Sequence, residues 1–215
     1  MTGVAVVLAG GEGRRMGGGK PQRLWGGRPL LSRAIELADG YASQVAVAVR
    51  AAGQAGQGAQ IPLLFDSPEI GGPLAGLASA LDFGRRQGAE WVQTLACDMP
   101  YLPADLSYRL AEALTREVGA VLPASGGRLH PVCGLWRVAS RDRLETYLTT
   151  GRSSLRGFAE HVGLREVVWG GPDADPFLNL NTLEELAAYQ PSTAAPAPTV
   201  AGPPPQAARS KRAGL

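Results

Sequence analysis

The sequence has little of what several common classes of protein depend on. Two of its 215 residues are cysteines, two are histidines, and aromatic residues make up 6%. Cys97 and Cys133 lie in apolar stretches without metal-ligand spacing. This predicts buried free thiols and excludes a disulfide framework or a cysteine metal site.

Long apolar runs and a strong net charge are also missing. No apolar run approaches the roughly 18 residues that a membrane-spanning helix requires. The formal net charge is only +2, which is not the strongly basic balance of a typical nucleic-acid or membrane-surface binder. The first residues enter an apolar strand directly and show no signal-peptide pattern. We therefore expect a soluble, cytoplasmic protein that binds neither nucleic acid nor membranes.

Short apolar runs alternate with stretches of helical spacing along most of the chain. The expected strands are 4–8, 45–49, 63–65, 91–97 and 120–122, and the expected helices are 29–39, 73–86 and 103–117. This alternation predicts an α/β fold with three Rossmann-like layers, a mostly parallel sheet between helices on both faces. Residues 1–190 are expected to form one domain. Residues 191–215 are rich in proline and alanine and are expected to be a disordered tail.

The most informative segment is 4–20, VAVVLAGGEGRRMGGGK. An apolar strand opens into a loop with six glycines, and Arg14, Arg15 and Lys20 supply positive charge. Glycine lets backbone N–H groups approach a ligand closely, and arginine matches the geometry of phosphate. The loop therefore predicts a phosphate site at the carboxyl end of the first strand.

Two familiar phosphate motifs do not fit this loop. A P-loop needs Ser or Thr after Gly-Lys, but Pro21 follows Lys20. A dinucleotide fingerprint needs glycine at the position of Met16, and no acidic residue ends the second expected strand at Val49-Arg50. Neither a P-loop nucleotidase nor a dinucleotide-binding oxidoreductase is indicated.

Two carboxylates end other expected strands. Asp98 follows the strand at 91–97, which would bring it to the same sheet edge as the glycine loop. One strand-end carboxylate is sufficient to hold Mg²⁺ when substrate phosphates supply further oxygens. The alternative is that Asp98 caps the turn before the helix at 103. Asp66 follows the strand at 63–65 and precedes a glycine-rich turn that opens a helix. This turn has two interpretations, an anion site at the helix N-terminus or a helix cap formed by Asp66 or Ser67.

The order of several motifs resembles the molybdenum cofactor guanylyltransferase family of the nucleotidyltransferase superfamily. The motifs are LAGGEGRRMGG, Lys20, FDS, GPLAGL, CDMPYLP, HPVCGLW and FLNLNTLEEL, and they cover about residues 4–189. The resemblance implies a nucleotidyltransferase fold. It also implies an enzyme that transfers GMP from GTP to molybdopterin with Mg²⁺ and releases pyrophosphate.

The resemblance also implies roles for particular residues. Four consecutive residues after the first strand would line the nucleotide site: Leu8, Ala9, Gly10 and Gly11. Arg15 and Lys20 would bind the GTP phosphates, with Lys20 at the α-phosphate. Asp66 would contact the nucleoside.

On the metal and acceptor side, Asp98 would hold Mg²⁺, and Asn179 and Asn181 would lie near the pterin. These two asparagines are also natural turn and N-cap residues for the helix expected from 182 to 189. No protein nucleophile is implied, because a phosphate acceptor is already ionised at neutral pH. His130, which precedes Pro131 at the start of an expected strand, is interpreted as structural or substrate-contacting.

Two positions depart from the family pattern. The family writes G-G-x-D-K where this chain has Gly17-Gly18-Gly19-Lys20, and a nucleoside-contacting asparagine of the family is replaced by Ala48. The departures leave open a cytidylyltransferase that acts on molybdopterin or another phosphorylated metabolite. A third alternative is a non-catalytic nucleotide-binding adaptor that docks with cofactor-biosynthesis or apoenzyme partners. The chain is expected to be a monomer.

Overall fold

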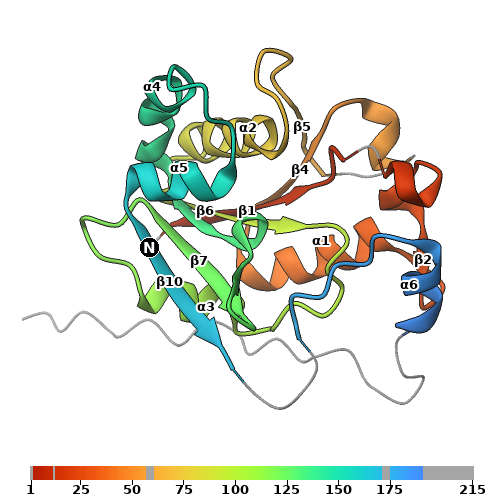
Figure 1. The fold of residues 1–215 in the computed structure, drawn as a ribbon. Coiled ribbons are helices and arrows are strands. Elements are labelled where there is room, and N and C mark those ends of the chain that lie inside the picture. The colour runs from red at the N-terminus through yellow and green to blue at the C-terminus, as the bar shows by residue number, and fades with distance from the viewer. Residues whose placement is uncertain (1, 12, 57–60, 171–174, 191–215) are drawn as a thin grey trace, which may run out of the picture.

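A mostly parallel sheet forms the middle layer of the structure (Figure 1). The computed structural model describes residues 2–11, 13–56, 61–170 and 175–190. Within them the strand order is β10-β7-β9-β6-β1-β4-β5, with β8 paired to β7. The strands are β1 (Gly3–Leu8), β4 (Val45–Val49), β5 (Leu63–Phe65), β6 (Trp91–Ala96), β7 (Ala120–Ser125), β8 (Arg128–Leu129), β9 (Leu135–Arg137) and β10 (Leu164–Trp169).

The strands that carry the expected site are parallel neighbours. β1 lies between β4 and β6, with Leu8 opposite Ala48 on one side and Ala96 on the other, and β4 continues the parallel pairing to β5. Their carboxyl ends therefore meet at one edge of the sheet, which is where open α/β sheets bind ligands. β9 runs antiparallel between β6 and β7, an insertion that the sequence pattern did not predict.

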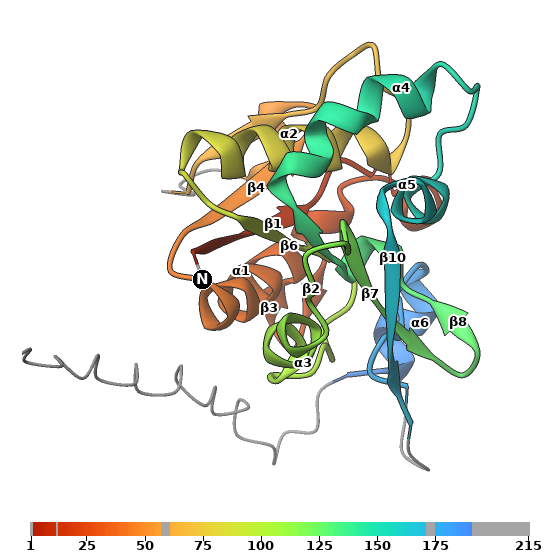
Figure 2. The same cartoon turned by 90° about the vertical axis from the view of Figure 1, so that its left-hand side faces the viewer.

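Helices cover both faces of the sheet (Figures 1 and 2). Two helices, α1 (Leu30–Tyr41) and α3 (Leu106–Glu112), pack on one face. Three others, α2 (Pro73–Arg86), α4 (Leu144–Leu148) and α5 (Leu155–Val162), pack on the other. In β1, Ala5 and Val7 belong to the first core, whereas Val4 and Val6 belong to the second. Successive side chains of a strand point to opposite faces, so burial on both faces produces the continuous apolar run of the sequence.

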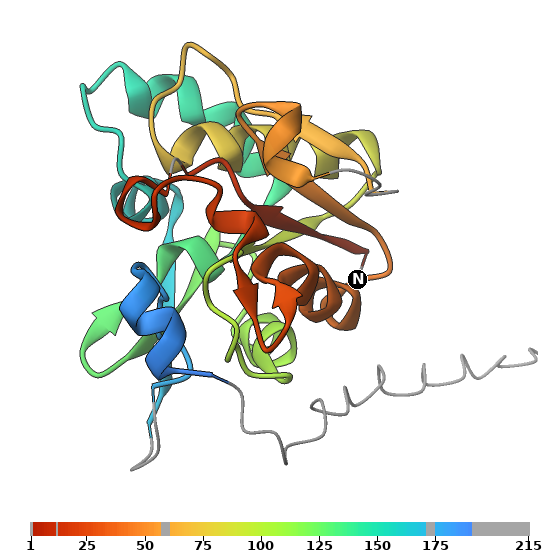
Figure 3. The same cartoon turned by 90° about the vertical axis from the view of Figure 1, so that its right-hand side faces the viewer.

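A third, smaller apolar cluster joins the two ends of the domain. The hairpin of β2 (Leu24–Trp25) and β3 (Arg28–Pro29) lies beside α6 (Leu183–Ala188), as Figure 3 also shows. The cluster's buried members come from the glycine loop, the hairpin, α1 and the last described segment: Met16, Trp25, Leu30, Leu180 and Leu186. This packing brings a segment near residue 180 onto the loop near residue 16.

The predicted α/β architecture is confirmed, and two local expectations are wrong. The helix expected over 103–117 spans only Leu106–Glu112, because tighter turns follow it, with Leu114 N–H donating to Ala111 and Val118 N–H to Thr115. The strand expected after His130 is a 3-10 helix, η4 (Pro131–Cys133). Proline is favoured at a first helical position because it has no N–H to leave unbonded.

Other expectations concern the thiols, the membrane and the tail. Cys97 and Cys133 are buried free thiols, as predicted, and burial raises the pKa of each to about 12. None of the described helices is both long and apolar enough to cross a membrane. Residues 191–215, the expected tail, lie outside the described residues.

Candidate active site

The centre of the candidate site is the Lys20 side chain. Its ammonium nitrogen lies 2.5 Å from Asp98 Oδ2 and 2.9 Å from Asn181 Oδ1, so that it donates to both oxygens. The Lys20 and Asp98 side chains are each 13% exposed. Residues that are 161 positions apart in the sequence thus meet on one cation. The N-cap residue of α3 is Asp105, so Asp98 does not cap that helix.

The glycine loop delivers Lys20 through an unusual backbone path. Gly17, Gly18 and Gly19 all have positive φ, at 70°, 82° and 62°, and Lys20 then begins the 3-10 helix η2 (Lys20–Gln22). Side chains other than glycine rarely adopt such φ values. A Cβ on Gly13 would lie 2.7 Å from the Lys20 Cβ, so the loop also folds back tightly against the lysine. The loop without the family's aspartate therefore still brings its lysine to Asp98.

Arg23 and Met16 hold this loop in place, and sequence reasoning missed both. The Arg23 guanidinium donates to the carbonyls of Met16 at 2.6 Å and Gly18 at 3.3 Å. Met16, the last residue of η1 (Arg14–Met16), is fully buried in the same cluster as Leu180. A large apolar residue within a glycine loop is the sequence signal that this loop packs against another part of the protein.

The segment before α6 closes the site from the other side. Leu180 N–H donates to the Asp98 carbonyl at 2.9 Å, next to the Asn181 contact with Lys20. The side chain that caps α6 is Thr182, whose hydroxyl accepts from Glu185 N–H, so the alternative that Asn181 is the cap is wrong. Asn179 Oδ1 is buried and has no hydrogen-bond partner within the described part of the chain.

Asp66 forms a second polar centre at the same sheet edge. A Cβ on Gly10 would lie 2.5 Å from Asp66 Oδ2, so only glycine permits this approach. Oδ1 of Asp66 is buried and unpartnered among the described residues, and Oδ2 lies 4.0 Å from the Arg50 Nε. Burial raises the pKa of Asp66, which the Arg50 charge only partly offsets. The N-cap of α2 is Gly72, so neither Asp66 nor Ser67 caps that helix.

The remaining predicted residues differ in how far they enter this site. Ala9 is buried, and its N–H donates to the Ala48 carbonyl at 2.8 Å, whereas Leu8 is half-buried and Gly11 is exposed. Arg15 in η1 is exposed and makes no ion pair within the described residues. The structure therefore brings Lys20, Asp98 and Asn181 together and leaves Arg15 apart.

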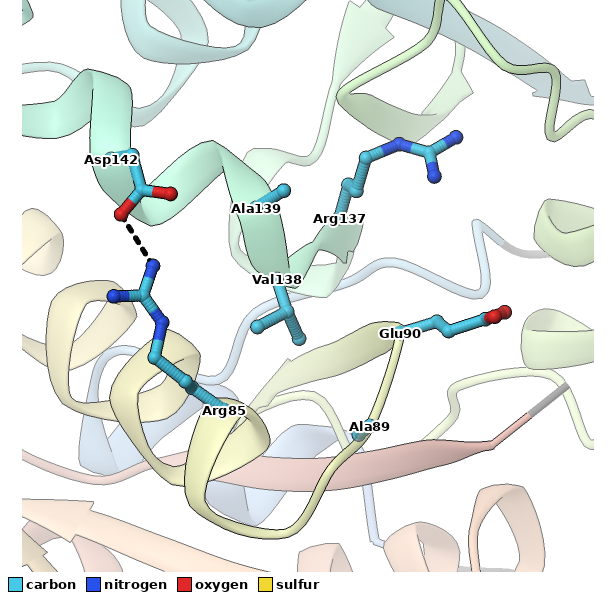
Figure 4. A pocket seen from close by; sticks show the side chains of 7 residues that line it. All are labelled: Arg85, Ala89, Glu90, Arg137, Val138, Ala139 and Asp142. Atoms are coloured by element: carbon cyan, nitrogen blue, oxygen red, sulfur yellow. Dashed lines mark hydrogen bonds and ion pairs between the residues drawn. The ribbon is translucent and has the colours of Figure 1, made fainter.

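Figure 4 shows a surface hollow, which lies at the other end of β6 from this site. Its volume is about 400 Å³ and its lining includes Arg85, Glu90, Arg137 and Asp142, of which Arg85 and Asp142 form an ion pair. Glu90 in the hollow immediately precedes β6, and Asp98 in the candidate site lies just after β6. The six residues of this strand therefore separate the hollow from the site by about 20 Å.

An ammonium group held between a strand-end carboxylate and an amide oxygen, beside a glycine loop, suits the transfer of a nucleotidyl group. The comparisons with known proteins agree with this class. Residues 5–166 match the family model of the MobA-like NTP transferase domain. The chain belongs to this family of nucleotidyltransferases, and within it to the molybdenum cofactor guanylyltransferases.

The relatives that support this family cover nearly the whole domain. The molybdenum cofactor guanylyltransferase of Cereibacter sphaeroides is 38% identical over 184 residues, which are 85% of this chain and 92% of the relative. That of Acidiphilium cryptum is 39% identical over 191 residues, or 86% of this chain and 93% of the relative.

Solved structures agree on the fold. Molybdopterin-guanine dinucleotide biosynthesis protein A of Archaeoglobus fulgidus superposes with a TM-score of 0.68 at 20% identity, over 86% of this chain and 95% of the other. The 2-C-methyl-D-erythritol 4-phosphate cytidylyltransferase of Thermus thermophilus gives 0.62 at 20% identity, over 87% and 97%. At these identities the likeness concerns the fold alone.

Proposed function

We propose that the chain transfers GMP from GTP to molybdopterin, forms the guanine dinucleotide form of the cofactor and releases pyrophosphate. The observation that carries the proposal is the meeting of Lys20, Asp98 and Asn181 at the edge where β1 ends. Family membership supports the reaction, because the relatives named above are guanylyltransferases.

The nucleotide would bind along the end of β1 and the start of the glycine loop. The nucleoside and its first phosphate would be lined by Leu8, Ala9, Gly10 and Gly11. The two glycines have no Cβ, so the backbone there permits close approach. Asp66 would contact the nucleoside with its buried Oδ1, which has no hydrogen-bond partner among the described residues. Lys20 and the exposed Arg15 would bind the phosphates, and Arg15 is free to move onto a ligand because it makes no ion pair within the described residues.

The donors around Lys20 fit a magnesium ion. Asp98 and Asn181 direct a carboxylate and an amide oxygen at one cationic group, and Mg²⁺ prefers such oxygen ligands. Asp98 would hold the ion, with substrate phosphates and waters as its other ligands. When bound, the ion supplies neutralisation of charge on the triphosphate.

The chain's own contribution is positioning and charge stabilisation. Lys20 would exchange its bond to Asp98 for one to the α-phosphate, where negative charge develops as the terminal phosphate of molybdopterin attacks in line. That phosphate is ionised at neutral pH, so the reaction needs no general base. Asn179 and Asn181 would orient the acceptor. The buried Asn179 Oδ1, which has no partner in the part of the chain that the structure describes, is suited to accept a hydrogen bond from it.

The choice of nucleotide is tested directly. Purified protein is incubated with molybdopterin and Mg²⁺ and either GTP or CTP, and the dinucleotide and pyrophosphate are quantified. We expect product with GTP and little with CTP. Preferential consumption of CTP would establish the cytidylyltransferase alternative, and nucleotide binding without pyrophosphate release would establish the adaptor.

We also propose that residues 1–190 carry the whole activity as a monomer. A chain that stops after Gln190 should then transfer GMP at the rate of the full chain and elute as a monomer in light-scattering chromatography. A loss of activity on truncation would assign a function to residues 191–215.

A further inference from the structure

A polar cluster at the end of β7 has no part in the functions described so far. Ser125, the last residue of β7, is 5% exposed, and its hydroxyl lies 2.7 Å from His130 Nε2 and 2.7 Å from Asp175 Oδ1. The His130 ring stacks on Phe177, with centroids 4.6 Å apart and planes inclined by 14°. Asp175 Oδ1 also accepts from Phe177 N–H at 2.9 Å.

The direction of these hydrogen bonds excludes a nucleophilic serine. A hydroxyl has one proton, and the Ser125 proton goes to the Asp175 carboxylate. His130 Nε2 must then donate to the hydroxyl, whereas a catalytic histidine accepts the serine's proton. Burial lowers the pKa of His130, and Asp175 only partly opposes this, which favours the neutral ring with its proton on Nε2. The trio is therefore a structural link and not a hydrolase triad.

The cluster fastens the start of the segment that ends on Lys20. Phe177 is 2% exposed and packs edge-on against Trp169, the last residue of β10, with centroids 5.4 Å apart. Only three residues separate Phe177 from Asn181, and within that interval Leu180 is fully buried with its N–H on the Asp98 carbonyl.

This segment contains both asparagines assigned to the acceptor. Asn179 lies midway between the two attachments, with its buried Oδ1 unpartnered among the described residues. A short segment that is fixed at both ends can hold such an orphaned oxygen in place, because neither end can move outward to hydrate it. An unbonded buried oxygen otherwise loses its hydration without compensation, which favours opening of the segment.

We propose that Ser125, His130 and Asp175 form a clamp that positions residues 177–181, and with them Asn179 and Asn181, for binding of the phosphorylated acceptor. The three are positioning residues that act through the asparagines. The inference rests on the proposed function in its last step only, because the clamp itself is a property of the free chain.

The first test measures the clamp without substrate. Hydrogen exchange of the amides at 177–181 is compared in the full chain, in Ser125→Ala and in Asp175→Ala. Asp175 is exposed, so its replacement leaves the core intact if the buried Ser125 variant folds poorly. We expect faster exchange at these amides in both variants. Ser140→Ala is the matched control, because Ser140 is also a buried serine and its hydroxyl donates to the Gly119 carbonyl. This variant should leave exchange at 177–181 unchanged.

The second test measures transfer of GMP to molybdopterin. Asp175→Ala removes both hydrogen bonds that Asp175 Oδ1 accepts, so the segment that carries the asparagines is no longer held in place. We therefore expect the KM for molybdopterin to rise roughly tenfold, with the KM for GTP unchanged. Asp175→Asn retains an oxygen that can accept from Ser125 and Phe177, and should keep the KM close to that of the unaltered chain.

The outcomes separate the clamp from the proposed function. Unchanged exchange at 177–181 overturns the clamp, whatever the kinetics. Faster exchange with an unaltered KM for molybdopterin, or with an equal rise in the KM for GTP, overturns its role in acceptor binding. If the unaltered chain transfers no GMP to molybdopterin, the proposed function fails, and the exchange data still decide the clamp.

Discussion

The Lys20 ammonium lies 2.5 Å from Asp98 Oδ2. It thus occupies the position beside this carboxylate that a bound metal ion would need. Each partner is 13% exposed, so the charges are shielded from water and neither is stable alone. In the proposed reaction the pair would have to separate when nucleotide and Mg²⁺ bind.

Loss of either partner should abolish most of the turnover. We expect Lys20→Met and Asp98→Asn each to lower kcat on the order of 10²-fold or more, because each removes charge stabilisation near the reacting phosphate. The double variant should be little worse than the poorer single one, since both groups act on one step. Arg86→Met is the control, an exposed cation at the end of α2. An effect on KM alone would instead indicate that Lys20 binds substrate and transition state equally.

The ammonium and the metal should compete for Asp98 in the absence of nucleotide. Lys20→Met removes a positive charge next to the carboxylate, so affinity for Mn²⁺, used as a probe for Mg²⁺, should rise by roughly tenfold or more. The free Mn²⁺ signal in electron paramagnetic resonance measures this without any turnover. Asp98→Asn in the same background should abolish the gain. Equal affinity in the unaltered chain and Lys20→Met would show that the metal does not use this carboxylate.

The approach of Gly10 to Asp66 predicts a strict need for glycine. In Gly10→Ala the new Cβ would lie 2.5 Å from Asp66 Oδ2, which should destabilise the fold by about 1–3 kcal/mol and weaken GTP binding. Gly53→Ala is the control, because a Cβ there meets no heavy atom within 4 Å. Thermal unfolding and calorimetric titration with GTP measure the two effects. Equal behaviour of the two variants would contradict the close approach.

Asp66 should also make stability depend on pH in a particular direction. Burial raises its folded-state pKa above the usual 3.8, so the unfolded chain loses the proton first as pH rises. The contribution of Asp66 to the free energy of unfolding is therefore fully present below pH 3.8 and is lost as pH rises through the raised pKa. Asp66→Asn cannot ionise and should lack this loss. Urea unfolding at pH 4 and pH 7 should show the variant gaining on the unaltered chain at pH 7, and a difference that does not vary with pH would contradict the burial.

Thr182 and Asn181 are neighbours with separable roles. Thr182→Ala removes the cap of α6 and should lower the free energy of unfolding by about 1 kcal/mol with little change in the nucleotide affinity. Asn181→Ala removes the bond to Lys20 and should lower turnover with a smaller effect on stability. Urea unfolding and steady-state kinetics on both variants give the comparison. A larger kinetic effect of Thr182→Ala would mean that α6 itself moves in the reaction.

Much of the fold could be predicted from the sequence because its signals are local. β4, β5 and α2 form with the expected bounds, since a continuous apolar run between turns, or proline before a helical pattern, specifies its element without help from distant residues. β9 was not predicted, because its three residues form a strand only by fitting antiparallel between β6 and β7. The expected helix at 103–117 was too long for a similar reason, since its last turns depend on neighbours.

The sequence by itself determined that a glycine loop with a lysine and two strand-end carboxylates would share one sheet edge, because parallel strands align their carboxyl ends. Only the tertiary structure decided which of these groups touch. Lys20 reaches Asp98 through three glycines with positive φ, Met16 meets Leu180 in a common cluster, and Ser125 meets Asp175. These contacts join segments 50 or more residues apart, and no local pattern records them, because their free energy comes from packing that exists only after the sheet has formed.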